Sequence, residues 1–272
     1  MYSGVMRIVN LPLLQALVST PEVVVTRLRS GPKILVDASD YCGRPIYWWG
    51  DYDSRITRLC VDALRPGDCM LDIGANYGEV ALAAASRVGP SGCVHAFEPN
   101  SRIAKLLYVS AELNGFANLR VHEIALGNSD RVAELAVPEG NTGAASLIRR
   151  CETRGSEGRA IETVTIRDAG QFLESLNLPS IDVVKIDVEG MEAEVFGSIH
   201  GLLRRFRPRL IVFESHEEIP FFERNAVRIL MGLAYKFSQL VVDRRVAARP
   251  KTLPITNDGD VRSGYDFLAT PN

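Results

Sequence analysis

Short apolar runs alternate with segments of helical periodicity along most of the chain. Apolar runs bounded by polar or glycine residues predict buried strands, and apolar residues three or four positions apart predict helices. The predicted strands are 70–73, 93–98, 119–124, 181–186, 210–213, 237–242 and 265–269. The predicted helices are 54–64, 79–88, 101–114, 168–176, 191–200 and 222–234. This alternation predicts an α/β fold with a doubly wound, largely parallel sheet that binds ligands at the carboxyl ends of its strands.

Two parts of the chain depart from this alternation. Residues 130–166 show period-two patterning and turn residues without a helical period, which predicts a β-rich insertion that shapes a substrate pocket. Residues 1–52 predict an N-terminal accessory segment, with a strand at 33–36, before a main domain over 53–272. The aromatic group at 41–52 holds both tryptophans of the chain. It favours either a packing patch or a lip over the ligand site.

The segment 69–79 joins a predicted strand to a helix through a tight glycine turn. Gly74, Asn76 and Gly78 form the pattern Gly-x-Asn-x-Gly, and Asp72 precedes them. Such a turn directs unpaired backbone N–H groups and the positive end of a helix dipole at a ligand. Its spacing differs from Gly-x-Gly-x-x-Gly, which holds a dinucleotide pyrophosphate. Fewer glycines and a preceding acid favour a ligand with a cationic amino-acid tail.

A second acid, Glu98, ends the next predicted strand and is followed by Pro99. It comes close to the spacing of about 20 residues expected for a carboxylate that binds ribose hydroxyls. A carboxylate at this place accepts hydrogen bonds from an unphosphorylated ribose and repels a 2′-phosphate. The two strand ends together predict a site for a nucleoside with a charged tail, which is S-adenosylmethionine.

Composition limits the class of partner and compartment. The 272 residues carry a formal net charge of −2, which predicts neither a nucleic-acid nor a membrane-surface partner. No stretch reaches the ~18–20 apolar residues of a membrane span, and the interrupted apolar segment 8–18 favours a docking helix over a signal peptide. The five cysteines show no CxxC or metal-binding spacing, and His95, His122 and His200 have no ligand spacing with them. This predicts free thiols and a cytoplasmic protein.

Five motifs together resemble the FkbM family of S-adenosylmethionine-dependent methyltransferases. They are Asp-Ile-Gly-Ala-Asn-Tyr-Gly at 72–78, Phe-Glu-Pro at 97–99, Asn-Thr-Gly-Ala-Ala-Ser-Leu at 141–147, Lys-Ile-Asp-Val-Glu-Gly at 185–190 and Phe-Glu-Ser-His at 213–216. The resemblance covers about residues 54–270. It implies a Rossmann-like, seven-stranded methyltransferase sheet with one antiparallel strand near the C-terminus. It also implies O-methylation of a hydroxyl on a small-molecule, saccharide or natural-product acceptor.

The resemblance also implies roles for individual residues. The cofactor-binding residues would be Asp72, Gly74, Asn76, Tyr77 and Gly78 in the glycine turn, Glu98 at the ribose, Ala125 in the segment facing adenine, and Asp187. Methyl transfer to a hydroxyl needs alignment, exclusion of water and a base for the alcohol proton. The candidate catalytic residues are Lys185, Asp187, Glu189, Glu214 and His216.

The identity of the base is open at this stage. Histidine has the best unperturbed pKa for the task, whereas a carboxylate needs its pKa raised by burial or by neighbouring acids. Lys185 is expected to pair with Asp187, which lies two residues further along the same strand. The acids also allow a Mg²⁺ ion that orients and acidifies the hydroxyl, although they do not require one.

Other functions compete with this interpretation. The glycine spacing disfavours a nicotinamide-dependent oxidoreductase, and residues 187–190 lack the proline pair of enzymes that methylate nucleic-acid amino groups. A protein methyltransferase and a non-catalytic module that binds S-adenosylmethionine are the remaining alternatives. The sequence names neither the acceptor nor the oligomeric state.

Overall fold

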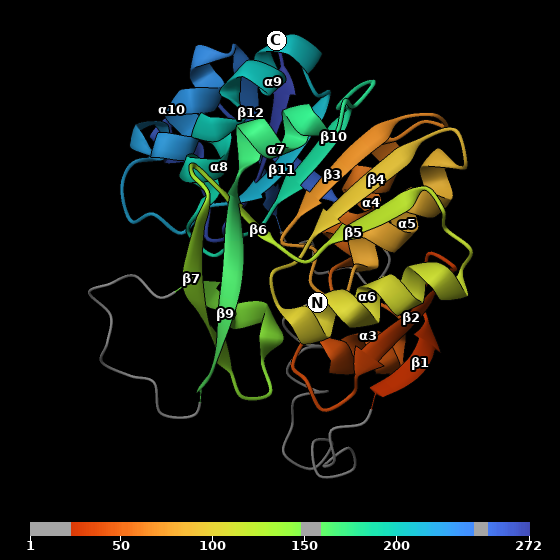
Figure 1. Ribbon diagram of the computed structural model, residues 1–272. Helices are drawn as coiled ribbons and strands as arrows, with labels where there is room; N and C mark the ends of the chain where they lie inside the picture. Colours follow the sequence, from red (N-terminus) through yellow and green to blue (C-terminus); the bar gives the residue numbers. More distant parts are fainter. Residues whose placement is uncertain (1–22, 148–158, 242–249) are drawn as a thin grey trace.

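The computed structural model describes residues 23–147, 159–241 and 250–272. The apolar segment 8–18 and Cys151 therefore lie outside the described residues. An eight-stranded sheet forms the centre of the molecule (Figure 1). Its strands, in spatial order, are β13 (Lys251–Ile255), β12 (Tyr235–Val241), β14 (Asp266–Pro271), β11 (Leu210–Glu214), β10 (Val183–Ile186), β3 (Cys69–Ile73), β4 (Cys93–Phe97) and β5 (Leu119–His122).

The direction of the strands fixes where a ligand can bind. The five strands from β11 to β5 are parallel, whereas β14 runs antiparallel to both β11 and β12. From β3 the chain proceeds to β4 and β5 on one side, and later to β10 and β11 on the other. Open α/β sheets bind ligands outside the carboxyl ends of the strands at such a reversal. The predicted doubly wound sheet is confirmed.

Helices cover both faces of the sheet and create two buried clusters. One cluster packs α4 (Ser54–Ala63), α5 (Glu79–Val88) and α6 (Ser101–Leu113) against residues such as Met70 and Val94. The other packs α7 (Ala169–Ser175), α8 (Glu192–Ser198), α9 (His200–Phe206) and α10 (Asn225–Gly232) against Leu71 and Phe97. Because β3 contributes alternate residues to both clusters, all five of its residues are buried.

A second, four-stranded sheet projects from one side of the first (Figure 1). Its order is β6 (Ala125–Gly127), β9 (Arg159–Asp168), β7 (Arg131–Pro138) and β8 (Ser146–Leu147). This sheet confirms the predicted β-rich insertion at about 130–166. Short 3-10 turns occur at Thr142–Ala144, Phe221–Glu223 and Asp258–Asp260.

The N-terminal part packs on the same core. The hairpin of β1 (Val23–Arg27) and β2 (Lys33–Asp37) lies beside α6, together with α3 (Gly43–Trp49) (Figure 1). Ile34 and Val36 belong to the buried cluster that contains α5 and α6. The strand expected at 33–36 is present. The boundary between 1–52 and 53–272 stays a prediction.

Three details differ from the sequence-based expectations. The sheet has eight strands instead of seven, and both β13 and β14 are antiparallel. β13 contains Pro254, which breaks a strand pattern in the sequence but is tolerated at the edge of a sheet. The helix expected at 191–200 is divided at Ile199 into α8 and α9. Asp53 caps α4 by accepting hydrogen bonds from the backbone N–H groups of Arg55 and Ile56.

Within the described residues, each helix falls short of the length and apolar character that crossing a bilayer requires.

Candidate active site

The glycine turn lies between the end of β3 and the start of α5. Gly74 and Gly78 have φ angles of +79° and +84°, which L side chains rarely adopt. A Cβ atom on Gly74 would lie 1.8 Å from the carbonyl oxygen of Asp187. The backbone N–H groups of Gly74 and Ala75 donate to the carbonyl of Phe97 at the end of β4. The turn is therefore fixed against both neighbouring strands.

A cavity of about 350 Å³ opens at the carboxyl ends of β3, β4, β10 and β11. Most of the site residues predicted from the sequence line it. They are Gly74, Asn76, Tyr77, Gly78, Glu98, Ala125, Lys185, Asp187, Glu189 and Glu214. The remaining two, Asp72 and His216, do not line the cavity. The fold thus brings residues of β6, β10 and β11 and of the segments that follow β3, β4 and β10 into a single site.

Glu98 is held in place by two backbone groups. The N–H of Asn76 donates to its Oε2 and the N–H of Asn100 donates to its Oε1, both at 2.8 Å. Burial raises the pKa of Glu98 to about 7, although these hydrogen bonds oppose the shift. A carboxylate has about four lone-pair positions, so two backbone donors leave acceptor capacity for a ligand. This placement suits the expected contact with ribose hydroxyls.

Asp72 does not face the cavity and instead forms a buried ion pair. Its side chain is 0% exposed, and its Oδ1 lies 3.4 Å from Nζ of Lys185. The ammonium group of Lys185 also donates to the carbonyl of Gly74 at 2.5 Å. Burial lowers the pKa of Lys185, but the carboxylates of Asp72 and Asp187 outweigh this and raise it above its usual value. Asp72 therefore positions Lys185 and the turn, and direct contact with the cofactor does not fit its location.

Three acids face one another across the cavity from the turn. The carboxylate oxygens of Asp187, Glu189 and Glu214 lie within 4.8 Å of one another. Burial and the neighbouring Asp187 raise the pKa of Glu214 to about 9. The same causes raise the pKa of Glu189 to about 7. Such a group of oxygens has the chemistry of a divalent-cation ligand set. The Mg²⁺ ion stays a prediction.

His216 lies outside the cavity but contacts the acid cluster. Its Nε2 is 3.1 Å from Oε2 of Glu214, and 44% of its side chain is exposed. Its ring also packs on Tyr265 with a centroid separation of 4.2 Å. His216 thus connects Glu214 to solvent, and its distance from the cavity disfavours direct contact with an acceptor.

Several residues that line the cavity were not predicted from the sequence as site residues. They are Cys42, Tyr52, Arg55, Glu79 and Asp266. Glu79 accepts hydrogen bonds from the backbone N–H groups of Tyr52 and Asp53, and burial raises its pKa to about 8. Asp266 lies beside Glu214 because β14 pairs with β11. Cys42 and Tyr52 lie within the group at 41–52, which the sequence offered as a lip without assigning single residues. No glycine or strand-end motif marked Arg55, Glu79 or Asp266.

The N-terminal part and the insertion meet at this cavity. The carboxylate of Asp40 accepts hydrogen bonds from the backbone N–H and the hydroxyl of Thr142, at 2.7 and 3.1 Å. Tyr52 lines the cavity, whereas Trp48 and Trp49 are 46% and 39% exposed. The aromatic group therefore serves both expected roles, since Tyr41 and Tyr52 also pack on the core.

A glycine turn at the reversal point, a carboxylate one strand away and acids across the cavity lie on a Rossmann-like sheet, the arrangement expected of a site that binds a nucleoside-containing cofactor. Residues 72–239 match the family model described as the methyltransferase FkbM domain. The chain belongs to this family, whose chemistry is methyl transfer from S-adenosylmethionine.

Individual proteins and solved structures resemble the chain at low sequence identity. The chain is 27% identical over 161 residues to the hexuronic acid methyltransferase AglP of Haloferax volcanii. This match covers 59% of this chain and 61% of that protein. A precorrin-6y C5,15-methyltransferase of Geobacter metallireducens is 15% identical over 81% of this chain and 90% of that chain, with a TM-score of 0.44. The methyltransferase FkbM of Methylobacillus flagellatus is 12% identical over 85% of this chain and 53% of that chain, with a TM-score of 0.42.

Proposed function

We propose that this protein transfers a methyl group from S-adenosylmethionine to a hydroxyl oxygen of an uncharged acceptor, most simply a saccharide. The observation that carries the proposal is the single cavity that joins the glycine turn and Glu98 to the acid cluster on β10 and β11. A sugar-derived acceptor is supported by the name of the Haloferax relative, although a hexuronic acid carries a carboxylate. The uncharged character of the acceptor is inferred from the charges around the cavity alone. We also retain the predicted cytoplasmic location, which the free thiols favour.

The charges around the cavity support a cationic cofactor and a neutral acceptor. Acids that line it are Asp53, Glu79, Glu98, Asp187, Glu189, Glu214 and Asp266, whereas the lining cations are Lys185 and Arg55. Both cations lie within 4 Å of acids. Glu79 and Glu214, with pKa values of about 8 and 9, are mostly neutral at neutral pH and add little to this field. The other lining carboxylates favour a sulfonium group and disfavour an anionic acceptor such as a nucleic acid.

The residues present fit S-adenosylmethionine. The turn at 74–78 lines the cavity where the methionine part would lie, with its backbone N–H groups held by hydrogen bonds within the protein. Glu98 offers carboxylate oxygens to the ribose. Ala125 and Leu126 line the same cavity and suit the adenine. When bound, the cofactor supplies an electrophilic methyl carbon on a positively charged sulfur.

Asp187 is the group that we assign as the base. Its carboxylate lines the cavity, and its Oδ2 lies 3.7 Å from Nζ of Lys185. Because the pKa of Glu214 is about 9, Glu214 holds a proton at neutral pH. As the acceptor oxygen took the methyl group, the bond from that carbon to sulfur would break and leave a neutral thioether, and the O–H proton of the acceptor would pass to Asp187. Glu214 and His216 form the path from there to solvent.

Calorimetry and methyl transfer test this proposal together. We expect heat on titration with S-adenosylmethionine and with its demethylated product, and none with NAD. Radiolabelled methyl groups should then appear on neutral saccharides within a panel that also holds uronic acids, RNA and peptides. The absence of binding heat would contradict the methyltransferase assignment. Labelling of RNA or peptide alone would contradict the acceptor class.

The affinity for the demethylated product should rise with pH and level off above about pH 8. Burial raises the pKa of Glu98 to about 7, and only its ionised form accepts hydrogen bonds from both ribose hydroxyls. Ligand binding therefore releases a proton below pH 7, and acid weakens it by up to about tenfold per pH unit. Calorimetry between pH 5.5 and 8.5 measures this slope.

Two variants test whether Glu98 or a neighbouring carboxylate causes the pH dependence of affinity. Glu98→Gln should bind more weakly with a flattened pH profile. Glu189→Gln is the matched control, because the pKa of Glu189 is also about 7 but its side chain belongs to the acid cluster. If the pH dependence of affinity persisted in Glu98→Gln and disappeared in Glu189→Gln, the carboxylate that causes it would be Glu189 and not Glu98.

A further inference from the structure

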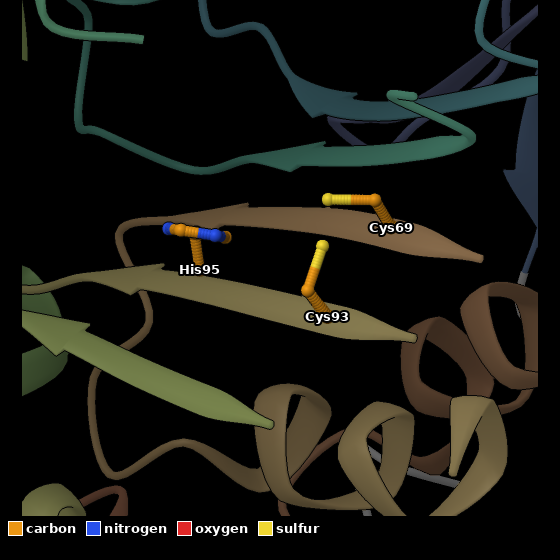
Figure 2. Close-up of side chains that lie close together, drawn as sticks. All are labelled: Cys69, Cys93 and His95. Atoms are coloured by element: carbon orange, nitrogen blue, oxygen red, sulfur yellow. The ribbon is translucent and has the colours of Figure 1, made fainter. Parts of the chain in front are cut away.

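Two cysteines and a histidine meet at the end of the sheet opposite the cavity. Cys69 begins β3 and Cys93 begins β4, and the two residues are direct partners in the parallel register. His95 lies two residues after Cys93, so its side chain is on the same face of β4. Figure 2 shows the three side chains converging on this face of the two strands. Their sulfur and nitrogen atoms all lie within 4.8 Å of one another.

This arrangement was not expected from the sequence. No cysteine–histidine spacing in the chain matched a metal motif, because Cys69 comes from a different strand. The pairing of β3 with β4 brings it opposite Cys93. The expectation that His95 has no ligand spacing with any cysteine was therefore wrong. The one local signal was Cys-x-His at 93–95, where a strand places both side chains on one face.

The cluster is accessible and separate from the proposed active site. Cys69 and His95 are buried, with 0% and 2% of their surface exposed, whereas Cys93 is partly exposed and opens the cluster to solvent. None of the three residues lines the cavity. Cys69 is five residues before Gly74 on an extended strand, a separation of about 16 Å. An ion bound here would not contact the methyl donor.

The donor atoms select the class of ion. Thiolate sulfur and imidazole nitrogen suit Zn²⁺ and other thiophilic transition metals, whereas Mg²⁺ and Ca²⁺ require oxygen. Zinc–sulfur and zinc–nitrogen bonds of about 2.3 and 2.1 Å place tetrahedral ligand atoms roughly 3.4–3.8 Å apart. The present cluster, with its atoms within 4.8 Å of one another, is wider than this by up to about 1.0–1.4 Å, which rotation of the two cysteine side chains can close.

His122 completes the environment of His95. Nδ1 of His95 lies 3.0 Å from Nε2 of His122, which comes from the neighbouring strand β5. The ring of His122 is fixed in turn by stacking on Phe97 with a centroid separation of 4.7 Å. When Nδ1–H of His95 donates this hydrogen bond, its Nε2 keeps a lone pair for a metal. Histidines that bind metals usually have such an outer partner, which fixes the ring and its tautomer.

We propose that Cys69, Cys93 and His95 bind one thiophilic metal ion, with zinc as its simplest occupant, and that His122 positions His95. A water molecule fills the fourth position, on the side where Cys93 is exposed. Binding displaces the thiol protons of both cysteines to solvent, and no redox step is involved. The ion joins β3 to β4 and stabilises the folded chain. This assignment does not depend on the proposed function.

Cobalt titration of the untagged, reduced protein tests the site. After dialysis against a chelator, we expect one equivalent of Co²⁺ to bind with sulfur-to-cobalt charge-transfer absorption, and Zn²⁺ to displace it. Cys93→Ser should weaken Co²⁺ binding by about 100-fold or more, and His122→Asn by about 10–100-fold. Cys60→Ala is the matched control, because Cys60 is also a buried free cysteine but lies on α4. It should bind Co²⁺ like the native chain.

The outcome does not depend on the folding of one variant. Circular dichroism and binding of the demethylated cofactor verify that Cys93→Ser is folded, and the stoichiometry of the native chain is a separate measurement. Absence of the charge-transfer band in the native protein would overturn the proposal. It would also fail if Cys93→Ser bound Co²⁺ as tightly as the native chain. A Cys69–Cys93 disulfide after mild oxidation, without metal binding by the reduced protein, would identify a redox pair instead.

Discussion

Replacement of Asp187 by asparagine is expected to lower kcat by about 10²–10⁴-fold, the usual range for loss of a general base. The side chain keeps its size and one acceptor oxygen but can no longer take the acceptor's proton. Asp187 lines the cavity beside Lys185 and Glu214, so the change removes a carboxylate of the acid cluster that also faces Lys185. Steady-state methyl transfer measures the loss, and calorimetry shows whether affinity for S-adenosylmethionine is retained.

Whether Asp187→Asn lowers kcat or weakens affinity for the cofactor distinguishes a catalytic role of Asp187 from a binding role. The sequence motif assigned Asp187 to both catalysis and cofactor binding, and a pure binding role would raise KM for the cofactor with little change in kcat. His216→Gln is the companion variant, because His216 contacts Glu214 but lies outside the cavity. We expect it to lower kcat by only about tenfold, which is less than the 10²–10⁴-fold typical of a residue that takes the proton directly. A larger loss in His216→Gln than in Asp187→Asn would move the base to His216.

Lys185→Met is expected to destabilise the fold by about 3–5 kcal/mol, the cost of leaving a buried charge without its partner. Only 7% of the surface of Lys185 is exposed, and its ammonium group faces the fully buried carboxylate of Asp72. Removal of the lysine also leaves the carbonyl of Gly74 without this donor. Urea unfolding measures the free-energy change, and Lys105→Met is the exposed control, expected within about 0.5 kcal/mol of the native chain.

The stability of a double variant at Lys185 and Asp72, and the pH dependence of stability, identify the cause of this loss. Lys185→Met with Asp72→Asn should recover much of the stability, since no uncompensated charge remains. In the native chain the pKa of Lys185 is raised, so its contribution is complete below pH 10 and is lost only above that. In Lys185→Met, acid should reduce the deficit, because Asp72 takes up a proton more readily without the ammonium group. A deficit that is independent of both pH and Asp72 would indicate lost packing alone.

The elements around the cofactor site followed closely from local pattern. The strand at 70–73, the turn at 74–78 and the helix from 79 are signalled by a continuous apolar run, glycines at positive φ and an amphipathic segment. These signals reside in neighbouring residues, so no tertiary information is needed to read them. β13 and α3 were missed because Pro254 and Pro45 interrupt their patterns.

For a related reason, the sequence predicted only some of the residues that line the cavity. Glu98, Asp187 and Glu214 end apolar runs, and parallel strands bring such ends to one edge of a sheet. Glu79 and Asp266 carry no such mark, since one is held by the loop at 52–53 and the other by pairing of β14 with β11. Asp72 belongs to the motif that predicts cofactor binding, but its side chain points to Lys185 inside the sheet and does not line the cavity.

By itself, the sequence determined the order of strands and helices, the glycine turn, the strand-end acids and hence the class of chemistry. These follow from local periodicity and from backbone requirements that few residue types meet. Only the tertiary structure decided which acids share a cavity, that Asp72 is paired instead of exposed, and that Cys69, Cys93 and His95 converge. Those relations join residues far apart in the chain, and they are set by strand pairing and burial, which local pattern does not encode.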